Sequence, residues 1–419
     1  MHVLDPKTLK IRQNRRVKHQ KRRYIYRVAC ALLVLILVIY VTLSLTLPLP
    51  ALSYTANQPI PDVNKPVNLK WPAYGQSAIG IVGFGPLESH GDQKPFPIAS
   101  IAKVVTALAV LKAKPLTTSQ QGPEITITAA DQDLYNQYLS EGQSVVEVAA
   151  GEKISQYQAL QALLLPSANN IAVILTDWAF GSQDGYLQFV NNFTKSIGMA
   201  STHIADASGY SPNTTSTAMD LTKLAENAMA QSVIAQIAAQ KAASLPVVGT
   251  VYNVNRLLGS NGVIGIKTGN TEEAGGCYMF AAKRSINGQD FTVIGVILGA
   301  PSLSTSMRDA PGLIDSTFAN IQTKQVIKKG QQYGQITRGD NISVPIIAEA
   351  DLSVLAWPSE PPALSVEINS LNLPIITHMP VGVIKAHSGS YSAEVKLLSA
   401  SRLTQPTLWY RLFHMAGHL

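Results

Sequence analysis

Ser100 and Lys103 lie three residues apart in an apolar stretch, residues 97–111, whose pattern is typical of a buried helix. Positions i and i+3 of a helix share one face, so the hydroxyl and the amine would be neighbours. A serine hydroxyl is a poor nucleophile at neutral pH and needs a base within hydrogen-bond reach. A lysine packed beside Ile101 and Val104 would lose hydration, which disfavours its charged form and lets it act as that base. Surface helices contain S-x-x-K by chance, with a solvated lysine, but the apolar setting favours catalysis here.

A second pair of polar side chains, Ser167 and Asn169, follows Pro166 at a break between two apolar segments, 156–165 and 171–178. A short polar turn between buried helices suggests a functional reason for its residues. Serine and asparagine are also favoured helix caps, and on this segment alone an ordinary cap is the simpler interpretation.

The tripeptide Lys267-Thr268-Gly269 ends one strand-like run, and a second begins at about Cys277. At the edge of a cleft, the lysine and the threonine would present a cation and a hydroxyl to a substrate carboxylate. The glycine would let the substrate backbone approach closely. The alternative is a hairpin turn with a solvated lysine.

The motifs occur in the order S-x-x-K, S-x-N and K-T-G, and together they resemble the signature set of penicillin-binding proteins and serine β-lactamases. Within that superfamily the chain is similar to the serine D-alanyl-D-alanine carboxypeptidases, the low-molecular-mass penicillin-binding proteins of the peptidase S11 type. The resemblance extends from about Trp71 to Leu313 and includes IASIAKVVTA, SANNIA, residues 206–225, IKTGNTEEAGG and VILGAPS. Residues 324–400 resemble, with weaker motifs, the β-rich second domain of the same family.

The resemblance implies catalytic roles for Ser100, Lys103, Ser167, Asn169 and Lys267. Ser100 would attack the carbonyl between two terminal D-alanines while Lys103 removes its proton. Ser167 and Lys267 would relay that proton toward the leaving amine, and Asn169 would bind the backbone amide of the substrate. Water would then hydrolyse the acyl-enzyme and release D-alanine, with no metal and no organic cofactor.

The same resemblance implies substrate-binding roles for Thr268, Gly269 and Asn270. Thr268 and Lys267 would hold the terminal carboxylate of a peptidoglycan stem peptide. The oxyanion hole would consist of the backbone N–H groups of Ser100 and Asn270. β-Lactam antibiotics would be covalent inhibitors of this site.

The chain departs from the family pattern at Ala168 and Asn170, where glycine and aspartate are frequent, and at Cys277, where an aromatic residue is usual. None of these positions has a bonding role in the scheme. The departures therefore bear on substrate preference and leave the catalytic assignment intact.

Several other functions are compatible with parts of the pattern. A β-lactamase of the commonest class needs a further glutamate to activate its deacylating water, and no glutamate lies between Glu152 and Glu226. An endopeptidase acting on peptidoglycan cross-links would use the same residues, although the β-rich second domain and the membrane anchor expected from residues 28–47 favour a carboxypeptidase. A wall-binding pseudoenzyme is disfavoured because all the motif residues are present. A metallopeptidase is disfavoured because His414 and His418 have no glutamate between them.

The hydrophobic pattern indicates how the motifs are brought together. Strand-like runs at 78–82, 277–282 and 291–299 lie near the two ends of the 73–323 segment, and helix-like runs lie between them, at 98–111, 156–165, 171–178 and 219–230. This order predicts an α+β domain of the penicillin-binding type, in which an antiparallel sheet is built from the ends of the segment and carries a helical insert.

The segments on either side differ in composition. Residues 48–72 contain six prolines, which predicts an extended stalk. Residues 324–402 alternate short apolar strands with Gly and Pro turns, which predicts a small all-β domain. Residues 403–419 combine aromatic side chains with Arg411. They are expected to form either an amphipathic membrane-surface helix or, alternatively, a frayed tail or a segment packed on its own domain.

The positive charge is confined to the amino terminus. Residues 1–27 hold ten Lys or Arg and one acid, so the net charge of +7 leaves −2 for the remaining chain, which argues against a nucleic-acid partner.

Residues 28–47 carry no charge and would span a bilayer as a helix. Lys and Arg stay on the cytoplasmic side, which predicts a single-pass anchor in the cell membrane with an extracytoplasmic catalytic domain. A cleaved signal peptide is the alternative, but the apolar stretch is longer than a usual signal core. Cys30 in this stretch cannot pair with Cys277 outside it, so the exported part relies on its core.

Overall fold

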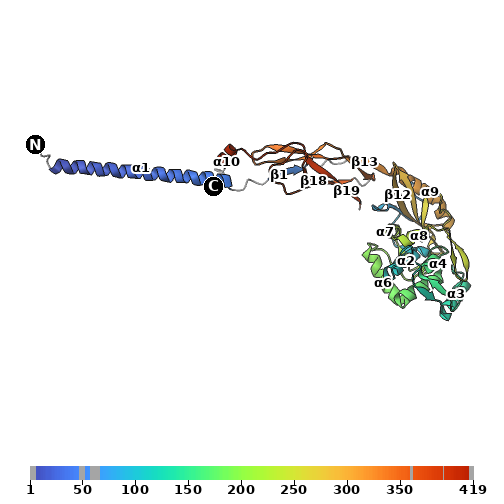
Figure 1. Cartoon of the computed structure of the whole chain (residues 1–419). Helices are drawn as coiled ribbons and strands as arrows, with labels where there is room; N and C mark the ends of the chain where they lie inside the picture. Colours follow the sequence, from blue (N-terminus) through green and yellow to red (C-terminus); the bar gives the residue numbers. More distant parts are fainter. Residues whose placement is uncertain (1–5, 47–51, 57–66, 359–361, 390, 415–419) are drawn as a thin grey trace.

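The computed structural model describes residues 6–46, 52–56, 67–358, 362–389 and 391–414. Figure 1 shows three parts in a row: the long helix α1 (Pro6–Thr46), a β-rich unit, and a mixed unit of helices and strands. The mixed unit comprises residues 67–321 and carries all three motifs. The β-rich unit comes last in the sequence but lies between the other two parts.

The mixed unit is built on a five-stranded antiparallel sheet with the strand order β10-β11-β12-β2-β3. Its strands come from both ends of the unit: β2 (Gln76–Ile81), β3 (Gly85–His90), β10 (Val263–Thr271), β11 (Gly275–Ile286) and β12 (Gln289–Ala300). Strand β2 pairs with β12, with Ala78 opposite Val296, so the early and late strands are hydrogen-bonded neighbours. The predicted antiparallel sheet built from the ends of the segment is confirmed.

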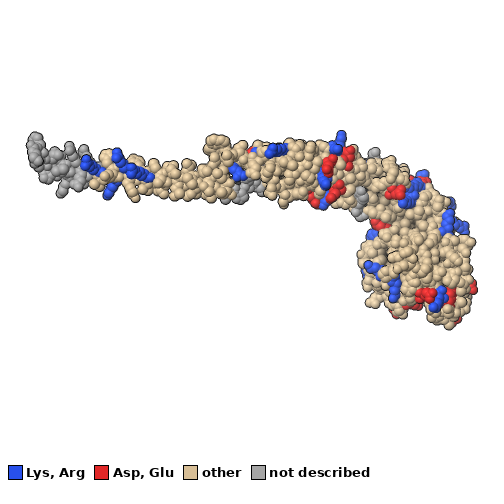
Figure 2. Space-filling model, in the orientation of Figure 1, with Lys and Arg blue, Asp and Glu red and all other residues tan. Residues whose placement is uncertain are grey.

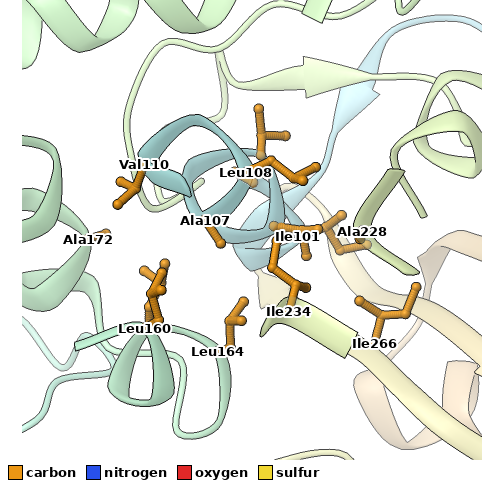
Figure 3. Close-up of a cluster of buried hydrophobic side chains, with 14 of the residues drawn as sticks. Ile101, Ala107, Leu108, Val110, Leu160, Leu164, Ala172, Ala228, Ile234 and Ile266 are labelled. Carbon is orange, nitrogen blue, oxygen red and sulfur yellow. The ribbon is translucent and has the colours of Figure 1, made fainter. Parts of the chain in front are cut away.

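Both faces of this sheet are covered, because successive residues of a strand point in opposite directions. On β11, Met279 joins the core under the helical insert, whereas Tyr278 and Phe280 join a second core with helix α9 (Leu303–Asn320). Figure 3 shows part of the first core, where side chains of several helices surround Ile101 and Leu108. The helical insert therefore packs on one face of the sheet, and α9 packs on the other.

The helical insert contains η1 (Ala99–Ile101), α2 (Ala102–Ala113), α3 (Ala129–Ser140), α4 (Gln156–Leu164), α5 (Asn169–Phe180), α6 (Gln183–Ser196), α7 (Ala218–Ala230) and α8 (Ser232–Ala238). Three short strand pairs connect them: β4 (Phe96–Pro97) with β7 (Thr215–Ser216), β5 (Glu124–Thr126) with β6 (Lys153–Ser155), and β8 (Ala242–Leu245) with β9 (Gly249–Tyr252). The four helix-like runs of the sequence are present as η1 with α2, α4, α5 and α7.

The β-rich unit is a six-stranded antiparallel sheet of order β1-β14-β15-β19-β18-β17 beside the pair β13–β16. The strands are β13 (Gln322–Ile327), β14 (Gln332–Thr337), β15 (Ser343–Ala348), β16 (Leu352–Ala356), β17 (Ala363–Ile368), β18 (Pro380–Ser388) and β19 (Tyr391–Ser399). The first strand of the sheet, β1 (Ser53–Ala56), comes from the segment before the mixed unit.

Strand β1 differs from the predicted stalk. Ser53 pairs with Thr337 and Ala56 with Gly334, because this short proline-free piece supplies an edge strand to β14. Further along, the backbone N–H of Lys70 donates to Ser316 Oγ at 2.9 Å, and Trp71 packs against the core beside α9. The described parts of residues 48–72 are therefore packed on the two units, while residues 47–51 and 57–66 lie outside the described part of the chain.

The two units are joined by more than the chain connection. Trp357 follows β16 of the β-rich unit, but its side chain is 1% exposed and belongs to the core of the mixed unit around α9. Its indole N–H donates to Glu88 on β3 at 3.1 Å. This residue couples the β-rich unit to the sheet that supports the motifs.

Helix α1 contains one segment, Arg16–Thr46, that is long and apolar enough to cross a membrane, a property that signal sequences share. It is longer than the predicted 28–47 span because the basic residues continue the same helix. The short helix α10 (Leu408–His414) lies against its carboxyl end, where the Arg411 guanidinium donates to the carbonyl of Leu45 at 3.1 Å. The predicted tail thus includes a helix beside α1, and residues 415–419 lie outside the described range.

Candidate active site

The first motif sits where the chain turns from β4 into α2. Ala99 has a φ of +47°, and the 3-10 turn η1 that follows places Ser100 one turn before Lys103. The Ser100 hydroxyl is half-buried, whereas Lys103 is 0% exposed. Their side chains meet, with 2.9 Å between Ser100 Oγ and Lys103 Nζ. The predicted nucleophile and base are therefore in hydrogen-bond contact.

Lys103 Nζ has two further partners, the side-chain oxygen Oδ1 of Asn169 at 2.6 Å and the backbone carbonyl of Ser208 at 2.9 Å. Both of these oxygens can only accept. A neutral amine has two N–H bonds and one lone pair, so its N–H bonds are used by Asn169 and Ser208. The lone pair is then left for the Ser100 O–H, which is the arrangement that a general base requires.

The environment favours that neutral amine. Burial lowers the pKa of Lys103 well below its ordinary value, because the charged form loses its hydration, and the nearby Lys267 ammonium lowers it further. The negative charge of Asp206 acts in the opposite direction and raises it. Desolvation is the largest of the three effects, so burial favours the neutral amine, which carries the lone pair that a base needs.

The second motif lies on the turn between α4 and α5. The residue that caps α5 is Ala168, which makes no side-chain cap bond, so the simpler interpretation as an ordinary helix cap is wrong. Asn169 instead contacts Lys103, and Ser167 has a φ of +72°. Among the described residues, Ser167 Oγ is buried without a hydrogen-bond partner. A buried, unpaired hydroxyl in a strained backbone conformation is typical of a functional site.

The third motif lies inside strand β10 and not at a hairpin turn. Lys267 is 2% exposed, and its Nζ donates to the carbonyl of Thr268 at 3.0 Å. Desolvation lowers the pKa of Lys267 to about 7. The alternative of a solvated lysine is therefore wrong, and this amine changes charge close to neutral pH.

Gly269 shows why β10 can pass so close to the nucleophile. A Cβ at this position would lie 3.0 Å from both the Ser100 backbone nitrogen and the Ala99 Cβ. A larger residue would push the strand away from Ser100. Asn270 follows and is exposed, and it pairs with Gly276 on β11.

The structure thus joins Ser100, Lys103 and Asn169 by direct hydrogen bonds and places Lys267 within electrostatic reach of Lys103. Gly269 packs on the backbone of Ser100. Within the described ranges, no side-chain hydrogen bond connects Ser167 or Asn270 to this group, and Thr268 is joined to it through its backbone carbonyl, which accepts from Lys267 Nζ. Those residues occupy the neighbouring turn and strand.

Sequence reasoning missed the loop that supplies the third partner of Lys103. The carboxylate of Asp206 accepts hydrogen bonds from the Ser208 backbone N–H at 3.2 Å, from its hydroxyl at 2.7 Å and from Thr214 Oγ1 at 2.5 Å. Gly209 lets the loop close on η1, since a Cβ there would lie 1.9 Å from the Ala99 carbonyl oxygen. The segment was part of the noted resemblance, but a backbone acceptor has no sequence signature.

The departure at Asn170 also has a structural role. Its amide pairs with the backbone of Val146, accepting from the N–H at 3.1 Å and donating to the carbonyl at 2.8 Å. It fixes residues 144–146 beside the second motif. The metallopeptidase alternative rested partly on His418, which lies outside the described residues.

A half-buried serine that contacts a desolvated lysine, beside a second lysine on the strand that lines them, defines a serine acyl-transfer site. The comparisons with known proteins agree. Residues 87–302 match the D-alanyl-D-alanine carboxypeptidase family, and the chain belongs to this family. The predictions of the family, the fold and the enzyme class are confirmed.

Individual relatives support the assignment. A D-alanyl-D-alanine carboxypeptidase of Streptomyces sp. is 31% identical over 238 residues, which cover 52% of this chain and 78% of the relative. The crystal structure of a Streptomyces DD-transpeptidase is 27% identical with a TM-score of 0.52 and covers 58% of this chain and 96% of its own. The D-alanyl-D-alanine carboxypeptidase DacD from Francisella tularensis is 18% identical with a TM-score of 0.57, covers 83% of this chain and 98% of its own, and shows the shared fold.

Proposed function

We propose that the protein is a membrane-anchored serine D-Ala-D-Ala carboxypeptidase that removes the terminal D-alanine from peptidoglycan stem pentapeptides. The observation that carries this proposal is the contact between Ser100 Oγ and the fully buried amine of Lys103 at 2.9 Å. Ser100 is the nucleophile and Lys103 is its base. Membership of the carboxypeptidase family supplies the substrate class.

Acylation begins when Ser100 Oγ attacks the carbonyl between the two D-alanines and Lys103 takes the hydroxyl proton. The resulting ammonium keeps Asn169 Oδ1 and the Ser208 carbonyl as acceptors. The backbone N–H groups of Ser100 and Asn270 stabilise the oxyanion, which is supported by the close approach of β10 to the Ser100 nitrogen. The carbonyl carbon thus gains a bond to Ser100 before it loses its bond to the leaving amine.

The leaving amine of D-alanine needs a proton. Ser167 Oγ is buried and has no partner in the described part of the chain, so it is free to take up the proton from Lys103 and pass it on. Lys267 is the other residue through which the proton is passed toward the leaving amine. The C–N bond then breaks, D-alanine departs, and the rest of the peptide remains as an ester on Ser100 until water hydrolyses it.

Substrate recognition depends on the carboxylate of the departing D-alanine. Lys267 and Thr268 are both nearly fully buried on β10, where an ion pair is stronger than in water. Because the pKa of Lys267 is about 7, an arriving carboxylate would favour its charged form. Asn169 binds the backbone amide of the peptide. A β-lactam carries a similar carboxylate and acylates the same serine.

Helix α1 would hold this site outside the cell. Figure 2 shows Lys and Arg gathered near the amino-terminal end of the described part of α1, followed by an uncharged stretch of the helix. That order supports a topology with the amino terminus in the cytoplasm and the mixed unit on the other side of the membrane. A protease-accessibility assay on intact cells would test this topology.

The function is tested by incubating the full chain in detergent with a synthetic pentapeptide that ends in D-Ala-D-Ala. Mass spectrometry should show the loss of a single alanine. The reaction should be abolished in Ser100→Ala and unchanged in Ser119→Ala, a matched control at an exposed serine. Cleavage of cross-linked dimers only would instead indicate an endopeptidase. Absence of both products would indicate a wall-binding protein without turnover.

A further inference from the structure

A chain of hydrogen bonds connects the end of α3 to the catalytic lysine. We propose that Gln143, held by Glu141, is a positioning residue that fixes the orientation of the Asn169 amide and so aims the Lys103 lone pair at Ser100. This inference rests on the proposed function, because it assigns Gln143 a role in the same proton transfer. The sequence motifs do not include either residue.

The geometry of the chain is continuous. Asn169 Nδ2 donates to Gln143 Oε1 at 2.6 Å, and Gln143 Nε2 donates to Glu141 Oε2 at 2.6 Å. The other carboxylate oxygen of Glu141 accepts from Gln137 Nε2 at 2.9 Å. The backbone N–H of Gln143 donates to the Tyr138 carbonyl at 3.0 Å, so the loop carrying Gln143 is tied to α3.

The carboxylate at one end sets the direction of every bond. A carboxylate only accepts, so Gln143 must turn its NH₂ group to Glu141 and its oxygen to Asn169. Asn169 must then turn its NH₂ group to Gln143, which leaves its oxygen for Lys103. The opposite orientation of either amide would place two donors or two acceptors against each other.

The orientation of Asn169 matters because of what Lys103 needs. The Ser208 carbonyl is part of the backbone and cannot turn, so Asn169 is the partner of Lys103 whose polarity can reverse. A reversed amide would offer its own N–H to the lone pair and compete with the Ser100 hydroxyl. It would also deprive the ammonium of an acceptor, which disfavours the charged form and lowers the pKa of the base.

The loop does not depend on the Gln143 side chain for its fold. The backbone N–H of Asn169 donates to the Ser144 carbonyl at 2.7 Å, and the amide of Asn170 holds Val146 by both its N–H and its carbonyl. Gln143 itself is half-buried. Replacing its amide by a thioether of similar size therefore removes the polar link and leaves the loop anchored.

The test measures the rate of acylation by a fluorescent penicillin as a function of pH, in the full chain in detergent. Gln143→Met should slow acylation at its pH optimum by about tenfold to a hundredfold. The acidic limb of its pH profile should move to lower pH. The exchange Glu141→Gln/Gln143→Glu should restore both the rate and the limb, because an acceptor again faces Asn169 and a donor again faces residue 143.

Gln132→Met is the matched control. Its side-chain oxygen also accepts a backbone hydrogen bond, from Ala150 at 2.9 Å, but among the residues that the structure describes no hydrogen bond joins it to Asn169. Its rate and pH profile should equal those of the wild type. If the wild type is labelled at Ser100 and Gln143→Met keeps both its rate and its acidic limb, the positioning role is refuted. The same holds if the rate falls without a shift of the limb and the exchange does not restore it. A wild type that is never labelled refutes the proposed function instead.

Discussion

Lys267 offers a quantitative test of the site, because burial in the fold disfavours the charged form that this amine adopts in water. Its pKa is about 7 in the folded protein and 10.5 in the unfolded chain. Each unit of that difference corresponds to about 1.4 kcal/mol, so below pH 7 the buried lysine reduces the free energy of unfolding by about 5 kcal/mol. The unfolded chain binds more protons than the folded one between pH 7 and 10.5, so this penalty shrinks as the pH rises through that window.

Replacing the amine by an apolar group of similar length should therefore stabilise the protein. Lys267→Met removes the penalty but also loses the bond from Nζ to the Thr268 carbonyl, which contributes about 1 kcal/mol. The expected net gain is about 4 kcal/mol at pH 6 and falls to about 1 kcal/mol at pH 9. Carboxypeptidase activity should be lost at both pH values, since the carboxylate has no cation to bind.

Urea unfolding of the full chain in detergent, followed by tryptophan fluorescence, measures the change at each pH. Trp71 and Trp178 pack against the two cores of the mixed unit and report on it. Lys283→Met is the control: this lysine lies on β11, is 49% exposed and pairs with Asp290, so its replacement should change stability by less than about 0.5 kcal/mol at either pH. If Lys267→Met is less stable than the wild type at pH 6, or if its gain in stability does not depend on pH, then desolvation does not lower the pKa of Lys267.

Three further perturbations test other parts of the molecule. The kcat/KM for the pentapeptide should rise with pH as Lys103 loses its proton and fall above about pH 7 as Lys267 loses its charge; Lys267→Arg should remove the basic limb, and an unchanged limb would assign it to another group. Gly209→Ala should lower the thermal midpoint and slow penicillin acylation, because its Cβ would lie 1.9 Å from the Ala99 carbonyl and displace the loop; equal rates in both proteins would contradict this. Trp357→Ala should lower the free energy of unfolding by about 3–5 kcal/mol and separate the unfolding transitions of the two units in calorimetry. Penicillin labelling should persist at temperatures below the first transition. A single, unchanged transition would show that Trp357 does not couple the two units.

The contact between Ser100 and Lys103 follows largely from the sequence, because the interaction is local. The spacing of Ser100 and Lys103 fixes their shared helical face, and the apolar residues around them already imply a desolvated amine. The order of the strand-like and helix-like runs likewise determines that early and late strands share one sheet.

The remaining partners of Lys103 could not be found this way. The Ser208 carbonyl comes from a position 105 residues along the chain, and every residue has such a group, so nothing in the sequence marks it. Gln143 has no sequence signature for a related reason. Its role depends on which way its side-chain amide is oriented, and that orientation is set by its contact with Glu141 in the folded protein. The strained backbone of Ser167 is also set by tertiary packing and not by residue type.

The predictions that rested on composition differ from the structure at the boundaries between the units. The prolines of residues 48–72 predict an extended stalk, yet Ser53–Ala56 becomes a strand because β14 offers it an unpaired edge. The change of composition near residue 324 places Trp357 in the second domain, but its ring fills a gap in the core around α9. Both outcomes depend on tertiary contacts between segments that are far apart in the sequence.

In the proposed mechanism, Ser100 is acylated because a neutral Lys103 accepts its proton. This mechanism is tested most directly by reacting the full chain with a penicillin, digesting the product and locating the adduct by mass spectrometry, for the wild type and for Lys103→Met at matched pH. The wild type should give a single adduct, on the peptide containing Ser100, and the variant should give none above background. An adduct on another residue, or equal labelling of Ser100 without the lysine, would contradict the mechanism.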